Sequence, residues 1–192
     1  MKIVLMTIGL PFSGKSSLAA EYRKKGWQII ERDKILAQVI NSQEFQAQTQ
    51  DYMSANENLP EECLFEFKNR LAIEMLNKEL QKIILDSDND NIFYDGTNLQ
   101  KASRAGVLEL KQSGVEVNGV FLDVPINEII DRAKKVYEED EPTGEFNEKA
   151  IFSLQRMYEM FEEPETSEGF NKLERLKQIE HETKYDIKLK NQ

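Results

Sequence analysis

Residues 9–16 read Gly-Leu-Pro-Phe-Ser-Gly-Lys-Ser, and their types and spacing suit the binding of a phosphate chain. Gly9 and Gly14 let the backbone turn tightly and bring its N–H groups against phosphate oxygens. Lys15 can reach the β- and γ-phosphates of a nucleoside triphosphate, and the Ser16 hydroxyl can ligate Mg²⁺. The segment is a complete G-x-x-x-x-G-K-S match, the Walker A or P-loop motif.

The flanking sequence supports this assignment. An apolar strand is expected over Lys2–Ile8, directly before the motif, and a helix over about Ser16–Lys25, directly after it. The start of such a helix offers free N–H donors and the positive end of its dipole to a bound anion. We therefore predict ATP and Mg²⁺ as ligands. The predicted nucleotide-binding residues, with Ser16 also the metal ligand, are Gly9, Pro11, Ser13, Gly14, Lys15, Ser16 and Ser17.

Asp33 is the first candidate for acid–base chemistry. It follows a short expected strand, Trp27–Ile30, and we expect that strand to lie beside the P-loop strand. A carboxylate at the carboxyl end of such a strand lies in the crevice where α/β proteins bind ligands. There it can accept the proton of a hydroxyl that attacks a γ-phosphate. Alternatively, Asp33 caps a helix that begins at Lys34, and the spacing alone favours neither role.

Two further side chains are candidates. Asp95 closes an expected strand, Ile92–Asp95, where it could hold a magnesium-bound water or hydrogen-bond the acceptor; turn and cap chemistry is the alternative. Arg132 lies on a helix expected over about Asn127–Tyr137 and could stabilise charge on a transferring phosphoryl group. Its alternative is a solvated helix face with Glu128 as its i,i+4 partner.

The elements that must position these residues alternate between apolar runs and helical patterns. This alternation predicts a three-layer α/β domain over residues 1–192, with a mainly parallel sheet. A further strand is expected over Val115–Val124, and the charged tail from Glu165 has no clear assignment. The other expected helical segments are a helix-rich stretch Lys34–Leu85, then Lys101–Gln112 and Glu148–Phe161.

Composition limits the classes of function. No apolar run approaches the roughly 18 residues of a membrane span, and the single cysteine excludes an internal disulfide framework, so we expect a cytoplasmic protein without a membrane partner. The formal net charge of −10 argues against broad, nonspecific binding of nucleic acid. The Asn-Lys-x-Asp element typical of guanine-binding GTPases is absent, because Asn77-Lys78 continues as Glu79-Leu80 within a helical pattern.

Short motifs, the P-loop among them, run in a fixed order from the N-terminus to about residue 160. They are Thr7-Ile8-Gly9, Pro11, Ser13-Gly14-Lys15-Ser16, Arg32-Asp33, Thr97-Asn98-Leu99, Asp123-Val124-Pro125, Glu128, Arg132 and Arg156-Met157-Tyr158. In this order the chain resembles the kinase domain of phage polynucleotide 5′-kinases and related small P-loop kinases. The C-terminal pieces Phe161-x-x-Pro164 and Glu168-Gly169-Phe170 resemble a signature within the same group.

The resemblance implies a transferase, namely an ATP-dependent kinase with Lys15, Asp33 and Arg132 as catalytic residues. In it Asp33 is the general base, Asp95 belongs to the substrate site, and Arg132 lies on a mobile helical lid near residues 126–145. The implied acceptor is the 5′-hydroxyl of a nucleic acid. The alternative acceptors are a nucleotide, a modified base or a small metabolite, and a third possibility is a module that binds nucleotide without turnover.

Two departures from the family pattern bear on the acceptor. The phage enzymes carry a phosphate-binding arginine three positions after the base, where this chain has Leu36, and a second lid arginine where it has Val136. Lys135 offers a point charge in place of the second arginine, without its bidentate fork. Arg104, assigned to the substrate site, or Lys134 is a candidate for the missing phosphate contact.

Overall fold

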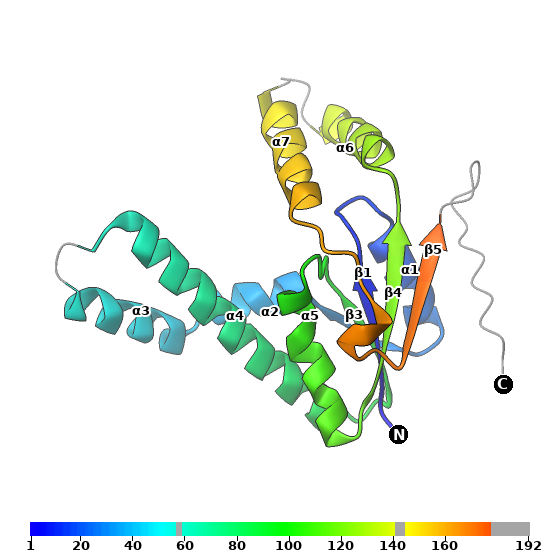
Figure 1. Ribbon diagram of the computed structural model, residues 1–192, viewed down its shortest axis with the longest axis horizontal. Coiled ribbons are helices and arrows are strands. Elements are labelled where there is room, and N and C mark those ends of the chain that lie inside the picture. Colours follow the sequence, from blue (N-terminus) through cyan, green and yellow to red (C-terminus); the bar gives the residue numbers. More distant parts are fainter. Residues whose placement is uncertain (57–58, 141–144, 178–192) are drawn as a thin grey trace.

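Five parallel strands form the centre of the fold (Figure 1). The computed structural model describes residues 1–56, 59–140 and 145–177. The strand order is β2-β3-β1-β4-β5, and every neighbouring pair in this sheet is parallel. The strands are β1 (Ile3–Ile8), β2 (Gln28–Glu31), β3 (Asn91–Asp95), β4 (Glu116–Asp123) and β5 (Lys172–Lys177).

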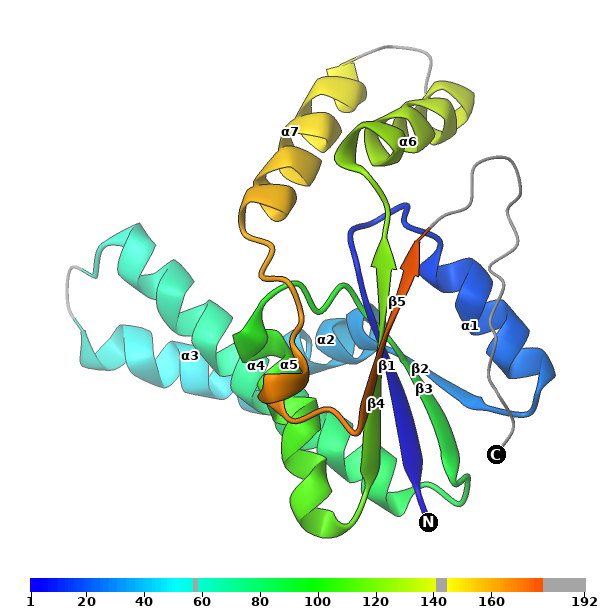
Figure 2. The same cartoon turned by 45° about the vertical axis from the view of Figure 1, so that its right-hand side comes forward.

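Helices cover both faces of the sheet and make the three layers (Figure 2). One face packs against α2, α4 and α5, and the other packs against α1. The segments that leave the neighbouring strands β1 and β3 lead to opposite faces, because α1 follows β1 and α5 follows β3. The helices are α1 (Lys15–Lys24), α2 (Arg32–Ile40), α3 (Gln43–Ala55), α4 (Glu61–Asp86), α5 (Lys101–Leu108), α6 (Ile126–Asp140) and α7 (Glu145–Glu159).

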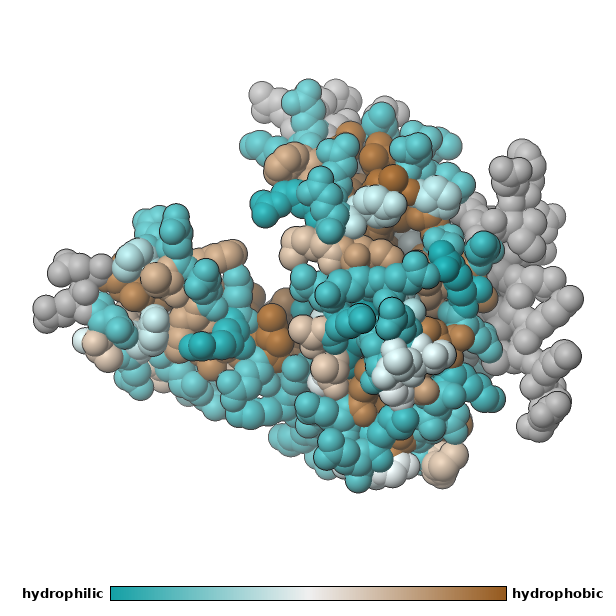
Figure 3. Space-filling view, viewed as in Figure 1, coloured by the Kyte–Doolittle hydropathy of each residue, from teal (hydrophilic) through white to brown (hydrophobic). Residues whose placement is uncertain are grey.

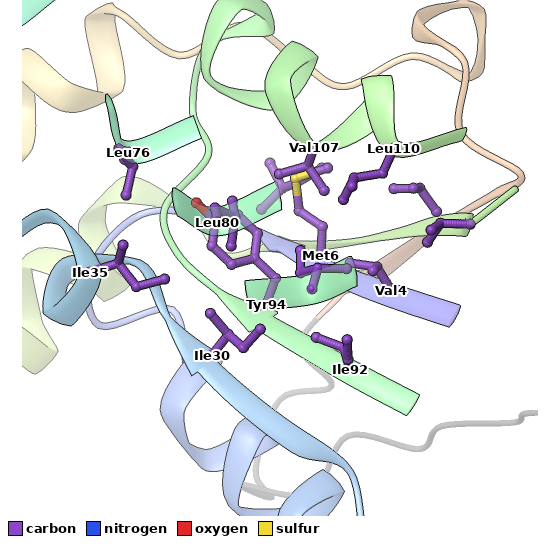
Figure 4. Packing of buried hydrophobic residues seen from close by; sticks show 14 of the residues in the cluster. Val4, Met6, Ile30, Ile35, Leu76, Leu80, Ile92, Tyr94, Val107 and Leu110 are labelled. Carbon is purple, nitrogen blue, oxygen red and sulfur yellow. The ribbon is translucent and has the colours of Figure 1, made fainter. Parts of the chain in front are cut away.

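The larger core lies between the sheet and the layer of α2, α4 and α5 (Figure 4). Met6 and Tyr94 project from adjacent central strands and are no more than 1% exposed. On α4, Leu76, Leu80 and Ile84 recur every fourth residue, which places them on one face of the helix, and all three are buried. The buried residues of the central strands and of one face of α4 therefore pack together and hold these strands in place.

Helices α6 and α7 lie beyond the carboxyl ends of the strands (Figures 1 and 2). They pack onto the P-loop through a small apolar cluster that contains Leu10, Ile129 and Leu154. Helices α3 and α4 extend sideways as an arm, where the rings of Tyr52 and Phe67 stack with centroids 3.8 Å apart. Figure 3 shows a hollow between this arm and helices α6 and α7.

The expected α/β fold with its parallel sheet is confirmed, but the C-terminal strand was not predicted. Strand β5 reads Lys-Leu-Glu-Arg-Leu-Lys and lies at the sheet edge, and only Leu173 and Leu176 among its residues are partly buried. A strand with so little apolar surface is recognisable only from its pairing with β4. The expected helix Lys101–Gln112 divides into α5 and a 3₁₀ turn, Glu109–Ser113. Part of the predicted lid, residues 141–144, and the tail beyond residue 177 lie outside the described residues.

A buried arginine joins the C-terminal segment to the rest of the fold. The Nε and Nη2 atoms of Arg104 donate to the two carboxylate oxygens of Glu168 at 2.6 and 2.7 Å. Its Nη1 lies 3.0–3.1 Å from the carbonyl oxygens of Asn98, Leu99 and Glu162. Arg104 is fully buried, so these bonds replace the water that a guanidinium would otherwise bind. The loop after β3, helix α5 and the segment after α7 are thereby tied together.

We predict that Arg104→Met lowers the free energy of unfolding by about 3–5 kcal/mol, because it leaves the carboxylate of Glu168 buried without its partner. Lys101→Met is the matched control: that side chain is 51% exposed and lies 3.6 Å from Glu165. The control should lose less than about 1 kcal/mol. Urea unfolding of both variants tests this, and equal losses would show that the buried pair does not stabilise the fold.

Candidate active site

The P-loop backbone depends on two glycines. A Cβ on Gly9 would lie 3.0 Å from the Ser13 hydroxyl and 3.1 Å from the Leu122 carbonyl oxygen, so a larger residue would displace the loop. Gly14 has φ 97° and ψ 12°, in the left-handed region, and is the N-cap of α1. No side chain caps this helix and no acidic residue stands in its first turn. Its first N–H groups are therefore open to an anion.

Lys15 lies across the loop and is only 9% exposed. Its Nζ donates a hydrogen bond of 2.6 Å to the carbonyl oxygen of Leu10. Burial lowers the pKa of Lys15 to about 8, while the negative charges of Asp95 and Asp33 oppose that shift. Both candidate carboxylates therefore raise the pKa of Lys15, although Asp95 ends β3 and Asp33 follows β2.

Asp95 lies at the carboxyl end of β3, immediately beside the P-loop strand β1. Burial raises the pKa of the Asp95 carboxyl, and the positive charge of Lys15 opposes this; Glu31 and Asp33 raise the pKa further. The Thr7 hydroxyl also lies 3.4 Å from Oδ1 of Asp95. In the sheet register Glu31 pairs with Asp95, so the carboxyl ends of β2 and β3 lie side by side.

Asp33 occupies the first turn of α2, and its side chain is 91% exposed. The helix begins at Arg32 with Glu31 as its N-cap, so the alternative in which Asp33 caps a helix starting at Lys34 is wrong. The expectation that β2 is adjacent to β1 is also wrong, because β3 lies between them. Asp33 nevertheless influences the pKa of Lys15, since the carboxyl ends of parallel strands share one edge of the sheet.

Arg132 reaches the P-loop from α6. Its Nη1 donates to the carbonyl oxygen of Phe12 at 3.0 Å, and its Nη2 lies 3.5 Å from the carboxylate of Glu128. The i,i+4 ion pair and the approach to the phosphate loop therefore occur together. The Phe12 ring also meets the Tyr137 ring edge to face, with centroids 5.6 Å apart. Helix α6 is attached to the P-loop at both points.

The remaining predicted nucleotide-binding residues lie in the P-loop and in the first turn of α1. Ser16 and Ser17 are exposed in the first turn of α1, Pro11 is half-buried, and Ser13 is buried within the loop. The described residues contain no group of three or more His, Cys, Asp or Glu side chains that could hold a metal ion. The exposed Ser16 hydroxyl and the open helix end fit Mg²⁺ that arrives bound to nucleotide phosphates.

Arg104 does not join this arrangement. It is fully buried, and its guanidinium bonds to Glu168 and to three carbonyl oxygens. We therefore do not retain Arg104 as a substrate contact. The cause is a long-range pairing between residues 104 and 168, which local sequence patterns do not reveal. Leu36, at the position of the family's phosphate-binding arginine, packs partly buried against the core.

The structure adds hydrogen bonds that Thr7 makes to the loop after β3, where the sequence favours a loop-shaping role for Thr97 and Asn98. The Thr7 hydroxyl accepts from the Gly96 N–H at 3.1 Å, and Asn98 Nδ2 donates to the Thr7 carbonyl oxygen at 2.8 Å. The Gly9 N–H donates to the Thr97 carbonyl oxygen at 2.9 Å. These bonds join the P-loop to the loop after β3 and so set Asp95 beside Lys15. The sequence indicated these segments only in that Thr7-Ile8-Gly9 and Thr97-Asn98 both belong to the ordered motifs of the family resemblance.

Comparisons with known proteins complete the description. Among solved structures, TT1252 from Thermus thermophilus is 13% identical, with 93% of this chain and 88% of that chain covered and a TM-score of 0.53. A gluconokinase from Sinorhizobium meliloti 1021 is 16% identical, covering 92% of this chain and 81% of that chain, with a TM-score of 0.48. Identities this low are evidence of a similar fold alone, and the TM-score of 0.48 for the gluconokinase is too low to support a further argument.

No curated protein matches this chain. Within the described residues, no helix is both long and apolar enough to cross a membrane. The phage polynucleotide kinases are not singled out by these comparisons, so that part of the sequence expectation stays a proposal. The model of the AAA domain family AAA_33, by contrast, matches residues 4–164. With its P-loop at the end of β1 and its parallel α/β sheet, the chain belongs to this AAA domain family.

Proposed function

We propose that this chain is an ATP-dependent kinase that transfers the γ-phosphate to a hydroxyl group. The supporting observation is that the P-loop, two carboxylates and an arginine lie together at the carboxyl ends of the strands. Lys15 follows β1, Asp95 ends β3, Asp33 follows β2, and Arg132 lies on α6 within 3.0 Å of the P-loop backbone. A simple nucleotide-binding module would not need an exposed carboxylate and a lid cation at the same place.

The nucleotide end of the reaction uses the P-loop. The open N–H groups of α1 bind the phosphates, and Lys15 exchanges its bond to the Leu10 carbonyl oxygen for a phosphate oxygen. Ser16, with Asp95 nearby, would hold Mg²⁺, which supplies charge neutralisation on the phosphates. Arg132 releases the Phe12 carbonyl oxygen and binds the transferring phosphoryl group, where its charge stabilises the transition state. In this proposal α6 and α7 form the lid.

The acceptor end uses Asp33. Its carboxylate takes the proton of the acceptor hydroxyl, whose oxygen attacks the γ-phosphorus while the bond to the β–γ bridging oxygen breaks. The side chain is 91% exposed, so an acceptor can approach it. Its Oδ1 lies 3.5 Å from Nη1 of Arg32, and this exposed contact is one that a substrate can replace.

The missing phosphate-binding arginine and the net charge of the chain favour a small hydroxyl-bearing molecule or nucleotide over a polynucleotide as the acceptor. Leu36 occupies the position of the phosphate-binding arginine in the polynucleotide kinases, and Arg104 is paired with Glu168. The chain as a whole carries a formal charge of −10, which opposes extended phosphate binding. The ordered resemblance of the sequence to polynucleotide 5′-kinases supports a second candidate acceptor, the 5′-hydroxyl of a short nucleic acid.

Asp33→Asn should lower the turnover rate roughly 10²-fold or more, as is typical when a general base is removed. ATP affinity should change little, because Asp33 serves the acceptor. Single-turnover kinetics and equilibrium binding measure the two effects separately. Asp88→Asn, an exposed aspartate in the turn before β3, is the matched control. Weaker ATP binding with unchanged turnover of the bound complex would move Asp33 from catalysis to nucleotide binding.

Nucleotide binding should depend on pH through Lys15. Because burial lowers its pKa to about 8, Lys15 becomes increasingly neutral above that pH in the free protein. Bound phosphate favours the charged form, so binding raises the pKa and takes up a proton. We expect ATP affinity to fall above about pH 8, with proton uptake seen by calorimetry in buffers of different ionisation enthalpy. Lys15→Arg stays charged and should lose both effects; if they persist, another group is responsible.

An acceptor screen with radiolabelled ATP tests the proposed function itself. Sugars, nucleosides, nucleotides and 5′-hydroxyl oligonucleotides are compared across a salt series, with Lys15→Met as the inactive control. We expect labelling of a small acceptor with a shallow salt dependence, since few phosphate contacts are available. Leu36→Arg should improve the use of 3′-phosphorylated acceptors. Labelling confined to oligonucleotides would favour the second candidate, and labelling of no acceptor would contradict the kinase proposal.

A further inference from the structure

Arg175, on the edge strand β5, contacts both segments that connect α6 and α7 to the sheet. Its Nε donates to Oδ2 of Asp123 at 2.8 Å, and its Nη1 donates to Oε1 of Glu163 at 2.6 Å. Asp123 is the last residue of β4, directly before the turn into α6. Glu163 follows the end of α7. One guanidinium therefore joins the entry into this helical unit to its exit.

Aromatic rings support the same contact. The guanidinium of Arg175 lies 5.2 Å from the ring centroid of Phe121 on β4. The Phe121 ring in turn lies 5.2 Å from the ring of Phe161, two residues beyond the end of α7 at Glu159. A cation over a ring face gains electrostatic attraction, and this stack fixes where the guanidinium sits. The arrangement holds the exit from α7 against β4.

The other hydrogen bonds at the exit from α7 fix only that segment. The Glu162 N–H donates to the Leu99 carbonyl oxygen at 2.9 Å, and Arg104 Nη1 lies 3.1 Å from the Glu162 carbonyl oxygen. Both bonds hold the exit from α7 to the body of the protein, and neither reaches the end of β4. Among the ion pairs of the described residues, those of Arg175 connect the two segments.

We propose that Arg175 is a positioning residue that holds both ends of the α6–α7 unit together and so keeps Arg132 over the P-loop. The side chains of Arg175, Asp123 and Glu163 are 45%, 29% and 59% exposed. Exposed ion pairs are individually weak and sensitive to salt, which suits a contact that must loosen when the helices move. The kinetic consequence rests on the proposed kinase function, but the mechanical one does not.

Hydrogen exchange tests the mechanical part without any assay of activity. Arg175→Gln removes both ion pairs. Lys172→Gln on the same strand makes the same change of charge but leaves both of these ion pairs intact. Amides over residues 124–137 and 150–163 should exchange about fivefold faster in Arg175→Gln, which corresponds to about 1 kcal/mol for exposed pairs. They should be unchanged in Lys172→Gln. Equal exchange in both variants would overturn the proposal.

A double-mutant cycle identifies Arg175 as the link. Asp123→Asn and Glu163→Gln each remove one carboxylate charge, and both carboxylates bind the same guanidinium. Their effects on exchange should be non-additive in the normal chain and additive when Arg175→Gln is also present. Additive effects in both backgrounds would show that the two contacts act separately. Arg175→Lys, which keeps the charge but lacks the fork, should restore part of the protection.

Kinetics separate the two proposals. If the kinase function holds, Arg175→Gln should lower kcat/KM for ATP about fivefold, in line with the loss expected for exposed pairs, and Arg175→Lys should recover part of it. Faster exchange in a protein that phosphorylates no acceptor would support the link and reject the function. Full activity with normal exchange in Arg175→Gln would support the function and reject the link.

Discussion

The first turn of α1 is left without a side-chain cap, and much of the structure is arranged around that open helix end. Its N–H groups are open to an anionic partner, and Gly14 takes a left-handed conformation at the turn from the loop into the helix. A rigid support is needed for a loop of this shape. Strand β1 provides it, because it lies in the middle of the sheet with Val4, Met6 and Ile8 fully buried.

The charges around the open helix end balance one another. Burial disfavours the ammonium of Lys15 and the carboxylate of Asp95, and each group lowers that penalty for the other. Asp33 adds a second negative charge nearby while remaining exposed. This division leaves one carboxylate partly buried beside the P-loop and one exposed to solvent. The parallel sheet makes this arrangement possible, since the carboxyl ends of three separate strands lie on the same side of the sheet.

Several cations serve as connectors between segments. Arg104 joins the loop after β3 to the C-terminal segment, and Arg175 joins the entry of α6 to the exit of α7. Arg132 and Lys15 bond to carbonyl oxygens of the P-loop itself. The two connectors differ in burial, because Arg104 is fully buried whereas Arg175 is partly exposed. A buried connector stabilises a fixed core, and an exposed one joins a unit that is proposed to move.

The sequence alone determined the phosphate-binding loop and most of the strands and helices, since these depend on neighbouring residues. Glycine at two positions, the lysine and serine that follow, and the nearly continuous apolar run of β1 are all local signals. The tertiary structure decided the strand order, with β3 between β1 and β2, and the pairing of the charged strand β5 with β4. It also decided that Arg104 faces Glu168 rather than a ligand. These features depend on contacts between residues far apart in the chain, and neither residue type nor local spacing encodes which distant partner a side chain meets.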